Sequence, residues 1–382
     1  MKKKLCFIMN VKQGKIYDEK FSFKDLKKKF NIKLFYIRNP AKNGKISQEK
    51  FNKLIFLVKK FNPHYIFVIA SLQKEKNLIF ETFNNMENIR LVDFQMAPFF
   101  GIQDLKSVSK IFYLNLFNFS KKNFAFVVLL LLKVFWIILK KIRYQKKMKF
   151  KLDYFFYSGS EGKNYNQFYN SKISYNVPSF DVLRLNRLKK ISLPKNKYVL
   201  FHDQMLLNHP DYKILNKKGP EDTSYYKKLN NFFDFLEKKF DYEIIISLHP
   251  RANLKKSKRL YNGRVCKLLN TAELVKNSEF SCLHASTTSI SFPIFFKKKI
   301  LLLTSNKILK NFNFRYRLEV LNNSLNLINL NIDDEKKYED KIKEFINTRV
   351  NNSKYHIYKR SFLGPNTKKY KYFSDICVDK LQ

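Results

Sequence analysis

Residues 243–253 read EIIISLHPRAN, a short apolar strand that ends in a His-Pro step. Two similar segments lie on either side of it, YVLFHDQMLLNHPD at 198–211 and EFSCLHASTTSISFPIFFKKKILLLT at 279–304. Each begins as an apolar run and becomes polar where the run stops. Such strands, separated by segments long enough for a helix, predict a parallel sheet with crossover helices.

The first half of the chain shows the same alternation of apolar runs and charged segments. Within 48–61, Phe51, Leu54, Ile55 and Val58 have the spacing of an amphipathic helix. We therefore predict an α/β fold with two Rossmann-like domains. The expected strands are 5–9, 33–37, 65–69, 90–94, 154–157, 198–202, 243–247, 280–283 and 300–303, and the expected helices include 48–61, 224–239 and 271–277.

The length of 382 residues exceeds what one hydrophobic core usually serves, so two domains are expected. We place the N-terminal domain at 1–190 and the C-terminal domain at 198–330, joined by the basic linker 187–197. Residues 331–382, with an amphipathic stretch at 333–350, are expected to form a helical extension that packs back on the body. The glycine-containing segment 158–162 is expected to be a turn or plain loop.

The formal net charge is +44, from 75 Lys and Arg against 31 Asp and Glu. Abundant Lys, Asn, Ile, Phe and Tyr with little Gly is what A+T-rich coding produces without selection for a partner. No zinc-finger, RNA-recognition or helix-turn-helix signature accompanies the charge, and this argues against nucleic acid as the partner. An anionic membrane surface is the better candidate. The four widely spaced cysteines indicate neither a disulfide framework nor a zinc site, which fits a cytoplasmic protein.

The segment 124–139, FAFVVLLLLKVFWIIL, is the most hydrophobic part of the chain. As a helix it spans about 24 Å, short of the roughly 30 Å of a bilayer core. Two interpretations stay open, a buried crossover helix and a helix that docks on the membrane surface through its flanking lysines. The second places the protein peripherally on the inner face of the cytoplasmic membrane.

Polar side chains follow three predicted strands, and the carboxyl ends of parallel strands are where open sheets bind ligands. Asp203, followed by Gln204, is a candidate general base that takes the proton from an acceptor hydroxyl. In the alternative interpretation, the Asp203 carboxylate caps a helix or braces a loop.

The His249-Pro250-Arg251 step suits a phosphate. Pro250 restricts the backbone of His249, whose imidazole can donate to a phosphate leaving group while Arg251 adds a bidentate donor. A lone His-Pro pair is also common as a purely structural feature. The third cluster offers hydroxyls at a probable helix start, where they either bind an anion or cap the helix. Its residues are Ser286, Thr287, Thr288 and Ser289, and His284 just before them is a further candidate for donor binding.

With these motifs in view, the second half resembles GT-B-type transferases of bacterial surface carbohydrate, including the bacterial sialyltransferases and capsule transferases. Those sialyltransferases carry an acidic motif, a His-Pro motif and a Ser-Ser/Thr motif in that order, matched here by Asp203, His249-Pro250 and Ser286-Thr287. The resemblance implies a GT-B-like fold, in which two Rossmann-like domains face across a cleft. It also implies an inverting, metal-independent glycosyltransferase that moves a sugar from a nucleotide-activated donor to a glycan or glycolipid such as capsule or lipopolysaccharide. It also implies that Asp203 is the base, that His249 and Ser286 hold the donor phosphate, and that no cofactor is needed.

The segment His202-Asp203-Gln204 lacks the second acidic residue and the glycine of the sialyltransferase motif, so the donor need not be a CMP-sugar. Polyol-phosphate transferases of cell-surface polymers share the His-Pro and Ser-rich steps and are the alternative enzyme class. A non-catalytic basic protein that binds glycan or nucleic acid is the alternative outside enzymes. No His in the sequence has carboxylate or thiolate neighbours at metal-ligand spacing, so no metal site is predicted.

Overall fold

The chain forms two compact units in a computed structural model. The first unit comprises Met1–Ala97, Lys141–Arg187 and Arg360–Gln382, and the second comprises Pro98–Lys140 and Leu188–Lys359. The predicted extension 331–382 is thus divided between the units. The structure describes residues 2–9, 15–37, 48–69, 73–96, 127–132, 134–135, 139, 150–169, 171–192, 194, 196–209, 212, 223–284 and 288–382.

The first unit contains a six-stranded parallel sheet in the order β2-β1-β3-β4-β5-β6. Apolar runs produce its central strands, and the five residues after Lys4 in β1 are all buried. Because both faces of a parallel sheet are covered by helices, such strands are apolar along their whole length. The strands are β1 (Lys4–Met9), β2 (Asn31–Tyr36), β3 (Tyr65–Ile69), β4 (Arg90–Gln95), β5 (Tyr154–Tyr157) and β6 (Ile173–Asn176).

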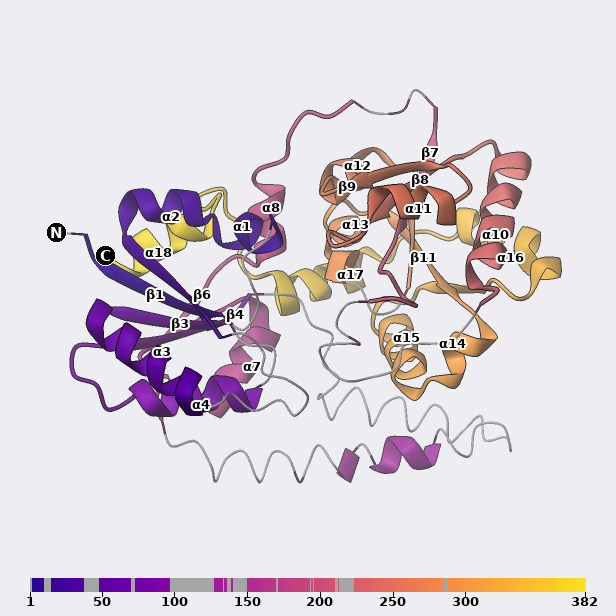
Figure 1. Cartoon of the computed structure of the whole chain (residues 1–382). Coiled ribbons are helices and arrows are strands. Elements are labelled where there is room, and N and C mark those ends of the chain that lie inside the picture. Colours follow the sequence, from indigo (N-terminus) through magenta and orange to yellow (C-terminus); the bar gives the residue numbers. More distant parts are fainter. Residues whose placement is uncertain are drawn as a thin grey trace. The chain divides into compact units, whose positions relative to one another are not determined.

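Helices cover both faces of this sheet (Figure 1). One face packs against α1 (Lys15–Phe21), α2 (Phe23–Lys29), α8 (Phe180–Leu185) and α18 (Phe373–Leu381), with Phe21, Phe180 and Phe373 in mutual contact. The other face packs against α3 (Gln48–Phe61) and α4 (Gln73–Phe83). The predicted helix 48–61 is confirmed. The segment 158–162, predicted as a turn, instead contains the start of α7 (Gly159–Tyr169).

The second unit contains another six-stranded parallel sheet, in the order β12-β11-β10-β7-β8-β9. Counted from β7 as the first strand, this order is the 3-2-1-4-5-6 arrangement of a Rossmann sheet. The order reverses between β7 and β10. The strands are β7 (Tyr198–His202), β8 (Glu243–Leu248), β9 (Val265–Leu268), β10 (Phe280–Leu283), β11 (Lys299–Thr304) and β12 (Ile328–Asn331).

The core of the second unit lies between one face of its sheet and two amphipathic helices, α10 and α16, which contribute Phe232, Phe233, Ile342 and Phe345. The predicted amphipathic stretch 333–350 therefore packs on the second sheet. The helices are α10 (Tyr225–Phe240), α11 (Leu254–Leu260), α12 (Thr271–Asn277), η1 (Thr288–Ile290), α13 (Ser291–Phe295), α14 (Asn306–Lys310), α15 (Phe312–Leu325), η2 (Glu335–Lys337), α16 (Tyr338–Asn347), α17 (Asn352–Tyr358) and a π-helical turn η3 (Lys359–Leu363) that crosses the unit boundary.

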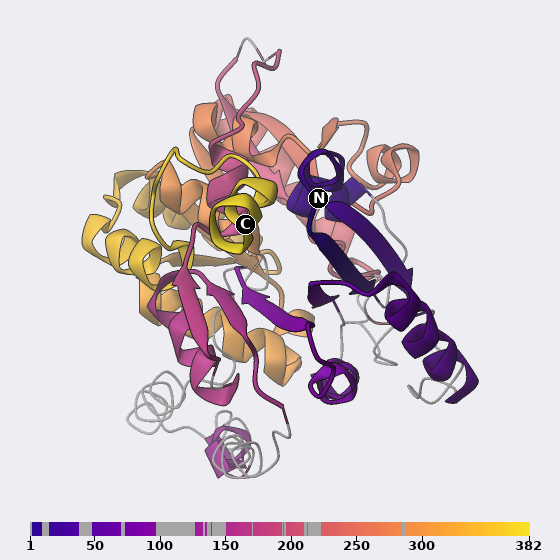
Figure 2. The same ribbon diagram turned by 90° about the vertical axis from the view of Figure 1, so that its left-hand side faces the viewer.

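The C-terminal segment returns to the first unit, where α18 lies near the N-terminus (Figure 2). The Lys3 ammonium donates to the carbonyl oxygens of Leu381 and Gln382, at 2.8 and 3.1 Å. The same segment passes over the start of α7. At Gly159 the φ angle is +69°, and a Cβ there would lie 2.3 Å from the Ser361 carbonyl oxygen. Only glycine fits this position.

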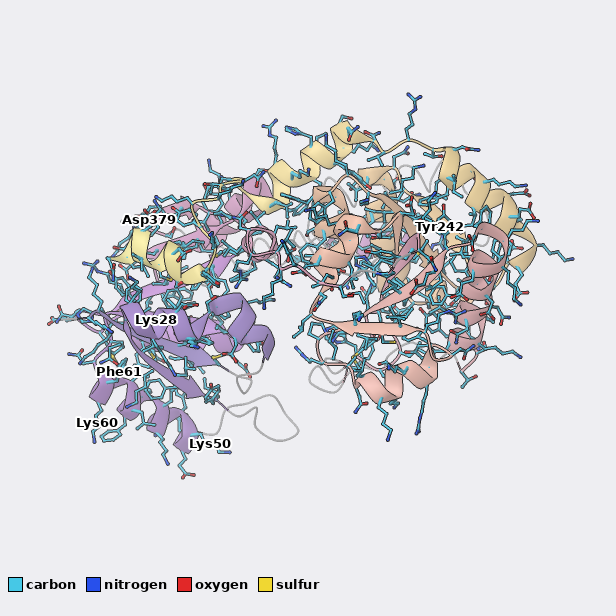
Figure 3. All side chains as sticks on the ribbon, turned by 90° about the horizontal axis from the view of Figure 1, so that it is seen from above. Lys28, Lys50, Lys60, Phe61, Tyr242 and Asp379 are labelled. Carbon is cyan, nitrogen blue, oxygen red and sulfur yellow. The ribbon has the colours of Figure 1, made fainter. Side chains whose placement is uncertain are left out.

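Exposed lysines lie on helices of both faces of the first sheet. Lys28 on α2 and Lys50 and Lys60 on α3 are all exposed, and these two helices cover opposite faces of the first sheet (Figure 3). No helix within the described residues is both long and apolar enough to cross a membrane.

Candidate functional site

The most promising site is the carboxyl edge of the second sheet where β7 and β10 meet. In open α/β sheets, ligands bind beyond the strand ends at the point where the strand order reverses. Gln204, just after β7, donates its Nε2–H to the His284 carbonyl oxygen just after β10, at 2.9 Å. Two residues predicted to bind the donor are therefore joined at the expected edge.

His202 is the last residue of β7 and ties three parts of this edge together. Its Nδ1 lies 2.8 Å from the Ser289 hydroxyl of η1, and its Nε2 lies 3.1 Å from the Ser281 hydroxyl of β10. Only 2% of the residue is exposed, and this burial lowers its pKa to about 3. His202 is therefore neutral near neutral pH and serves as a structural link.

Asp203 braces the turn that follows β7. Its Oδ1 accepts the Met205 backbone N–H at 2.7 Å, and Met205 has a left-handed φ of 52°. The Tyr261 hydroxyl donates a second hydrogen bond to the carboxylate. Burial raises the pKa of Asp203, while these two hydrogen bonds oppose the rise. The carboxylate thus has the loop-bracing contact considered above, and its raised pKa is also what a general base needs.

Three tyrosines form an aromatic cluster next to Asp203. Tyr226 contacts both Tyr225 and Tyr261, with ring centroids 5.1 and 5.7 Å apart. The Asp203 charge adds to burial in raising the pKa of Tyr226 and of Tyr261. These phenols therefore stay protonated and available as donors. The sequence analysis did not identify them, since single tyrosines carry no signal in a chain with 22.

His284 is a buried, neutral part of the same cluster. Its Nδ1 lies 2.7 Å from the Leu303 carbonyl oxygen and must donate to it, so its Nε2 accepts the hydrogen bond from the Tyr225 hydroxyl. Burial is the main reason that its pKa is lowered to about 4. The His284 side chain therefore holds β10, β11 and α10 together, while its backbone carbonyl contacts Gln204.

His249 follows β8 and pairs with a second histidine. Its Nδ1 accepts the Arg251 backbone N–H at 3.2 Å, and its Nε2 lies 3.4 Å from Nε2 of His209. The two rings are 4.8 Å apart and tilted by 73°. Both histidines are half-buried and Arg251 is exposed. The sequence analysis noted the His-Pro step but did not pair it with His209, which lies in the segment after the neighbouring strand β7.

The hydroxyl cluster is described only in part. Ser286 and Thr287 lie outside the described residues, and Thr288 is the first residue of η1. Within the described residues no group of three or more His, Cys, Asp or Glu side chains could hold a metal ion.

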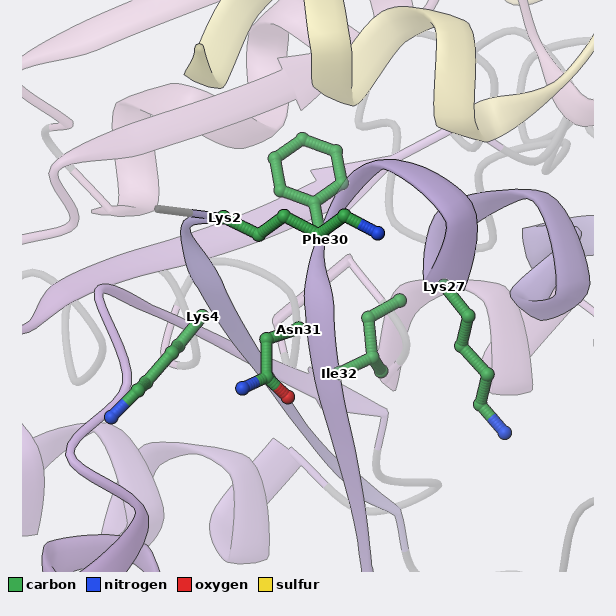
Figure 4. A pocket seen from close by; sticks show the side chains of 6 residues that line it. All are labelled: Lys2, Lys4, Lys27, Phe30, Asn31 and Ile32. Atoms are coloured by element: carbon green, nitrogen blue, oxygen red, sulfur yellow. The ribbon is translucent and has the colours of Figure 1, made fainter.

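A separate hollow of about 460 Å³ lies in the first unit (Figure 4). It includes Lys4 and Asn31, the first residues of β1 and β2, and so lies at the amino ends of these strands. That is the opposite edge from the one where parallel sheets bind ligands. The strand-order argument therefore favours the edge at β7, β8 and β10.

No known family model matches the sequence, and no curated protein is a detectable relative. Solved structures match over the whole chain. The spinosyn rhamnosyltransferase SpnG superposes with a TM-score of 0.52 at 8% identity, covering 98% of this chain and 99% of its own. The calicheamicin glycosyltransferase CalG4 gives 0.51 at 8% identity, covering 99% and 97%.

The glycosyltransferase SnogD from Streptomyces nogalater gives 0.50 at 6% identity, covering 100% of this chain and 99% of its own. This chain has a GT-B-like fold. The prediction of two Rossmann-like α/β domains is confirmed by the two parallel sheets and by these structures. Identities this low establish the fold alone.

Proposed function

We propose that the protein is a glycosyltransferase that uses a nucleotide-activated sugar. The observation that carries this proposal is the set of polar side chains after β7, β8 and β10, at the strand-order reversal of a Rossmann sheet. The GT-B-like fold supports it. The solved structure of SpnG, which shares this fold, is of a complex with thymidine diphosphate.

In this proposal His249 and Arg251 donate hydrogen bonds to the donor phosphate and stabilise the charge that develops as the bond from sugar to phosphate breaks. Ser286, Thr287 and Thr288 add hydroxyl donors, and Gln204 and His284 shape the pocket edge. Asp203 takes the proton from the acceptor hydroxyl as that oxygen attacks the anomeric carbon. The reaction inverts the anomeric configuration without a metal ion.

We propose a surface glycan or glycolipid as acceptor, on the strength of the resemblance carried by Asp203, His249 and Ser286. A polyol-phosphate transferase of cell-surface polymers is the alternative, because its chemistry needs the same phosphate-binding residues. The two enzyme classes differ in the donor that they use. The glycosyltransferase uses a CMP-sugar or another nucleotide-sugar, and the polyol-phosphate transferase uses a CDP-polyol.

A thermal-shift screen against CMP, CDP, UDP, GDP, ADP and thymidine diphosphate tests the proposal. A ligand that binds only the folded protein raises its melting temperature. We expect one nucleotide to raise it and the Arg251→Ala variant to lose most of that rise. Stabilisation by heparin with no response to any nucleotide would overturn the enzyme proposal in favour of a polyanion-binding protein.

We also propose that 124–139 docks on an anionic membrane surface. In its described part, Val127 and Leu130 are buried, whereas Val128, Leu129, Leu131, Leu132, Phe135 and Leu139 are 38–59% exposed. A buried crossover helix would have most of these side chains covered. Exposed apolar side chains next to the lysines and arginine of 140–143 match the apolar boundary and anionic headgroups of a membrane.

Vesicle flotation tests this docking. The wild type is expected to float with phosphatidylglycerol vesicles and much less with phosphatidylcholine vesicles. The triple variant Leu129→Ser, Leu132→Ser, Phe135→Ser should lose flotation because it removes apolar area from the contact surface. Phe56→Ser is the matched control, since Phe56 on α3 is 64% exposed in the first unit. Undiminished flotation of the triple variant would refute the docking.

A further inference from the structure

His209 and His249 form an imidazole pair whose two closest atoms are both Nε2, 3.4 Å apart. At this distance only one of the two nitrogens can carry a proton, because two facing N–H groups repel. The pair lies beyond β7 and β8, next to the strand-order reversal. Its protonation state can be worked out from its neighbours.

The tautomers follow from the Arg251 backbone N–H, which donates to Nδ1 of His249. A neutral His249 therefore carries its proton on Nε2, and this N–H points to Nε2 of His209. His209 accepts there and carries its own proton on Nδ1. Both rings are neutral in this arrangement, and the hydrogen bond between them is satisfied.

Neither ring accepts a further proton without losing a contact. A proton added to Nε2 of His209 would face the N–H of His249. A proton added to Nδ1 of His249 would face the Arg251 N–H. The pair is thus neutral in this geometry, and a cationic pair must give up either the contact between the rings or the hydrogen bond from the Arg251 N–H.

Within the described residues, the charged and titratable groups with an established link to the pair are Arg251, Tyr212 and, through Tyr212, Arg317. The Tyr212 ring lies 6.2 Å from that of His209, and Arg317 of α15 interacts electrostatically with Tyr212. The Nε of Arg317 is buried without a hydrogen-bond partner among the described residues. Asp203 has its carboxylate engaged by Met205 and Tyr261. Two arginines thus add positive charge around the pair, which favours a bound anion.

A phosphate oxygen can only accept hydrogen bonds, so the site needs N–H groups that point to the ligand. His249 can turn its Nε2–H from His209 to a phosphate. Nε2 of His209 becomes a donor either in the other neutral tautomer or when the ring takes up a proton, and a bound anion favours the second state because it balances the new charge.

We propose that His209 is a second ligand of the donor phosphates, and that anion binding separates the two histidines with uptake of one proton from solvent. This inference rests on the proposed function, because it assumes that the donor phosphates occupy the edge beyond β7 and β8. It adds a residue and a proton-coupled step to that site.

Isothermal titration of the full-length protein with inorganic pyrophosphate tests the inference. The titration is run near pH 7.5 in two buffers of different ionisation enthalpy, and the dependence of the observed heat on buffer gives the number of protons taken up. We expect the wild type to take up about one proton more than His209→Gln. Glutamine accepts the His249 N–H and can donate to phosphate, but it does not titrate.

His356→Gln is the matched control, because His356 is an exposed histidine of the second unit, on α17. This variant should take up as many protons as the wild type. Any change in the protonation of pyrophosphate itself is the same in all three proteins, so it cancels when their proton uptake is compared. If His209→Gln fails to fold, ¹⁵N NMR of the wild-type imidazoles with and without pyrophosphate gives the same information, and one ring of the pair is expected to become cationic.

Binding with equal proton uptake in the wild type and His209→Gln overturns the inference and leaves the proposed function standing. Two rings that stay neutral in the NMR experiment do the same. Failure of pyrophosphate to bind also overturns the inference. The proposed function is refuted as well only if no nucleotide binds in the thermal-shift screen.

Discussion

The Tyr261 hydroxyl donates a hydrogen bond to the Asp203 carboxylate, which also accepts the Met205 N–H. Tyr261 is 1% exposed, so the phenol holds this acid from inside the core of the second unit. Asp203 therefore combines two features, a structural contact in the turn after β7 and a carboxylate whose pKa is raised by burial. A substitution that keeps the turn contact but removes the ionisable carboxylate tests the two features separately.

Asp203→Asn is that substitution, because the amide oxygen can still accept the Met205 N–H while the side chain no longer acts as a base. We expect the variant to keep its melting temperature and to lose about 10²- to 10⁴-fold in turnover of the nucleotide-sugar identified by the screen. Asp203→Ala removes the turn contact as well and should also be less stable. An Asp203→Asn enzyme with full turnover would eliminate Asp203 as the base.

Tyr261→Phe is expected to change the pKa of Asp203 while leaving the Asp203 side chain itself in place. Loss of a donor to the charged form raises the pKa of Asp203 further. A base must be deprotonated to act, so the acidic limb of the kcat/KM profile should move to higher pH. The rate on the plateau should change little. Tyr226→Phe is the control, since Tyr226 lies near Asp203 and loses the same atom. An acidic limb at the same pH in Tyr261→Phe and the wild type would contradict this prediction.

The sequence predicted the central strands well because they are buried on both faces and read as continuous apolar runs. The edge strands β6, β9 and β12 were missed for the opposite reason. Three of the four residues of β6 are exposed, and β9 and β12 have one fully buried residue each. Short, half-exposed strands give no apolar run, although they complete the sheet in which β7 and β10 mark the strand-order reversal.

The positions of His249 and Gln204 after strands could be predicted because each follows an apolar run, while their roles in a site stay predictions. Contacts were missed where partners come together only through folding. His209 and His249 are 40 residues apart, and the α7 contact of Ser361 depends on a C-terminal segment that returns to the first unit. No local pattern in the sequence encodes these pairings.

Acid is expected to destabilise the second unit through His202 and His284. Their folded-state pKa values are lowered to about 3 and about 4, from the ordinary 6.5. Below about pH 6.5 the unfolded chain binds protons that the folded unit excludes, so stability falls as pH drops toward 4. The expected slope is about 1.4 kcal/mol per pH unit for each histidine.

Urea unfolding followed by circular dichroism at several pH values between about 7.5 and 4.5 measures this loss. The slope should decrease in His284→Gln, which removes one of the two groups, and stay unchanged in His356→Gln, which alters an exposed histidine. An equally steep pH dependence in all three proteins would show that the loss comes from other groups.

Gly159→Ala tests the attachment of the C-terminal segment to the first unit. The added Cβ would lie 2.3 Å from the Ser361 carbonyl oxygen and 2.6 Å from that of Arg360, and the φ of +69° is unfavourable for alanine. Because both obstacles are backbone atoms, the segment must shift, and we expect a loss of about 2–3 kcal/mol in the free energy of unfolding.

Gly263→Ala is the matched control, with a φ of +79° and no atom within 4 Å of the new Cβ. It carries only the backbone strain, about 1 kcal/mol. Equal losses in the two variants, measured by urea unfolding, would mean that residues 360–361 do not pack on α7 as described.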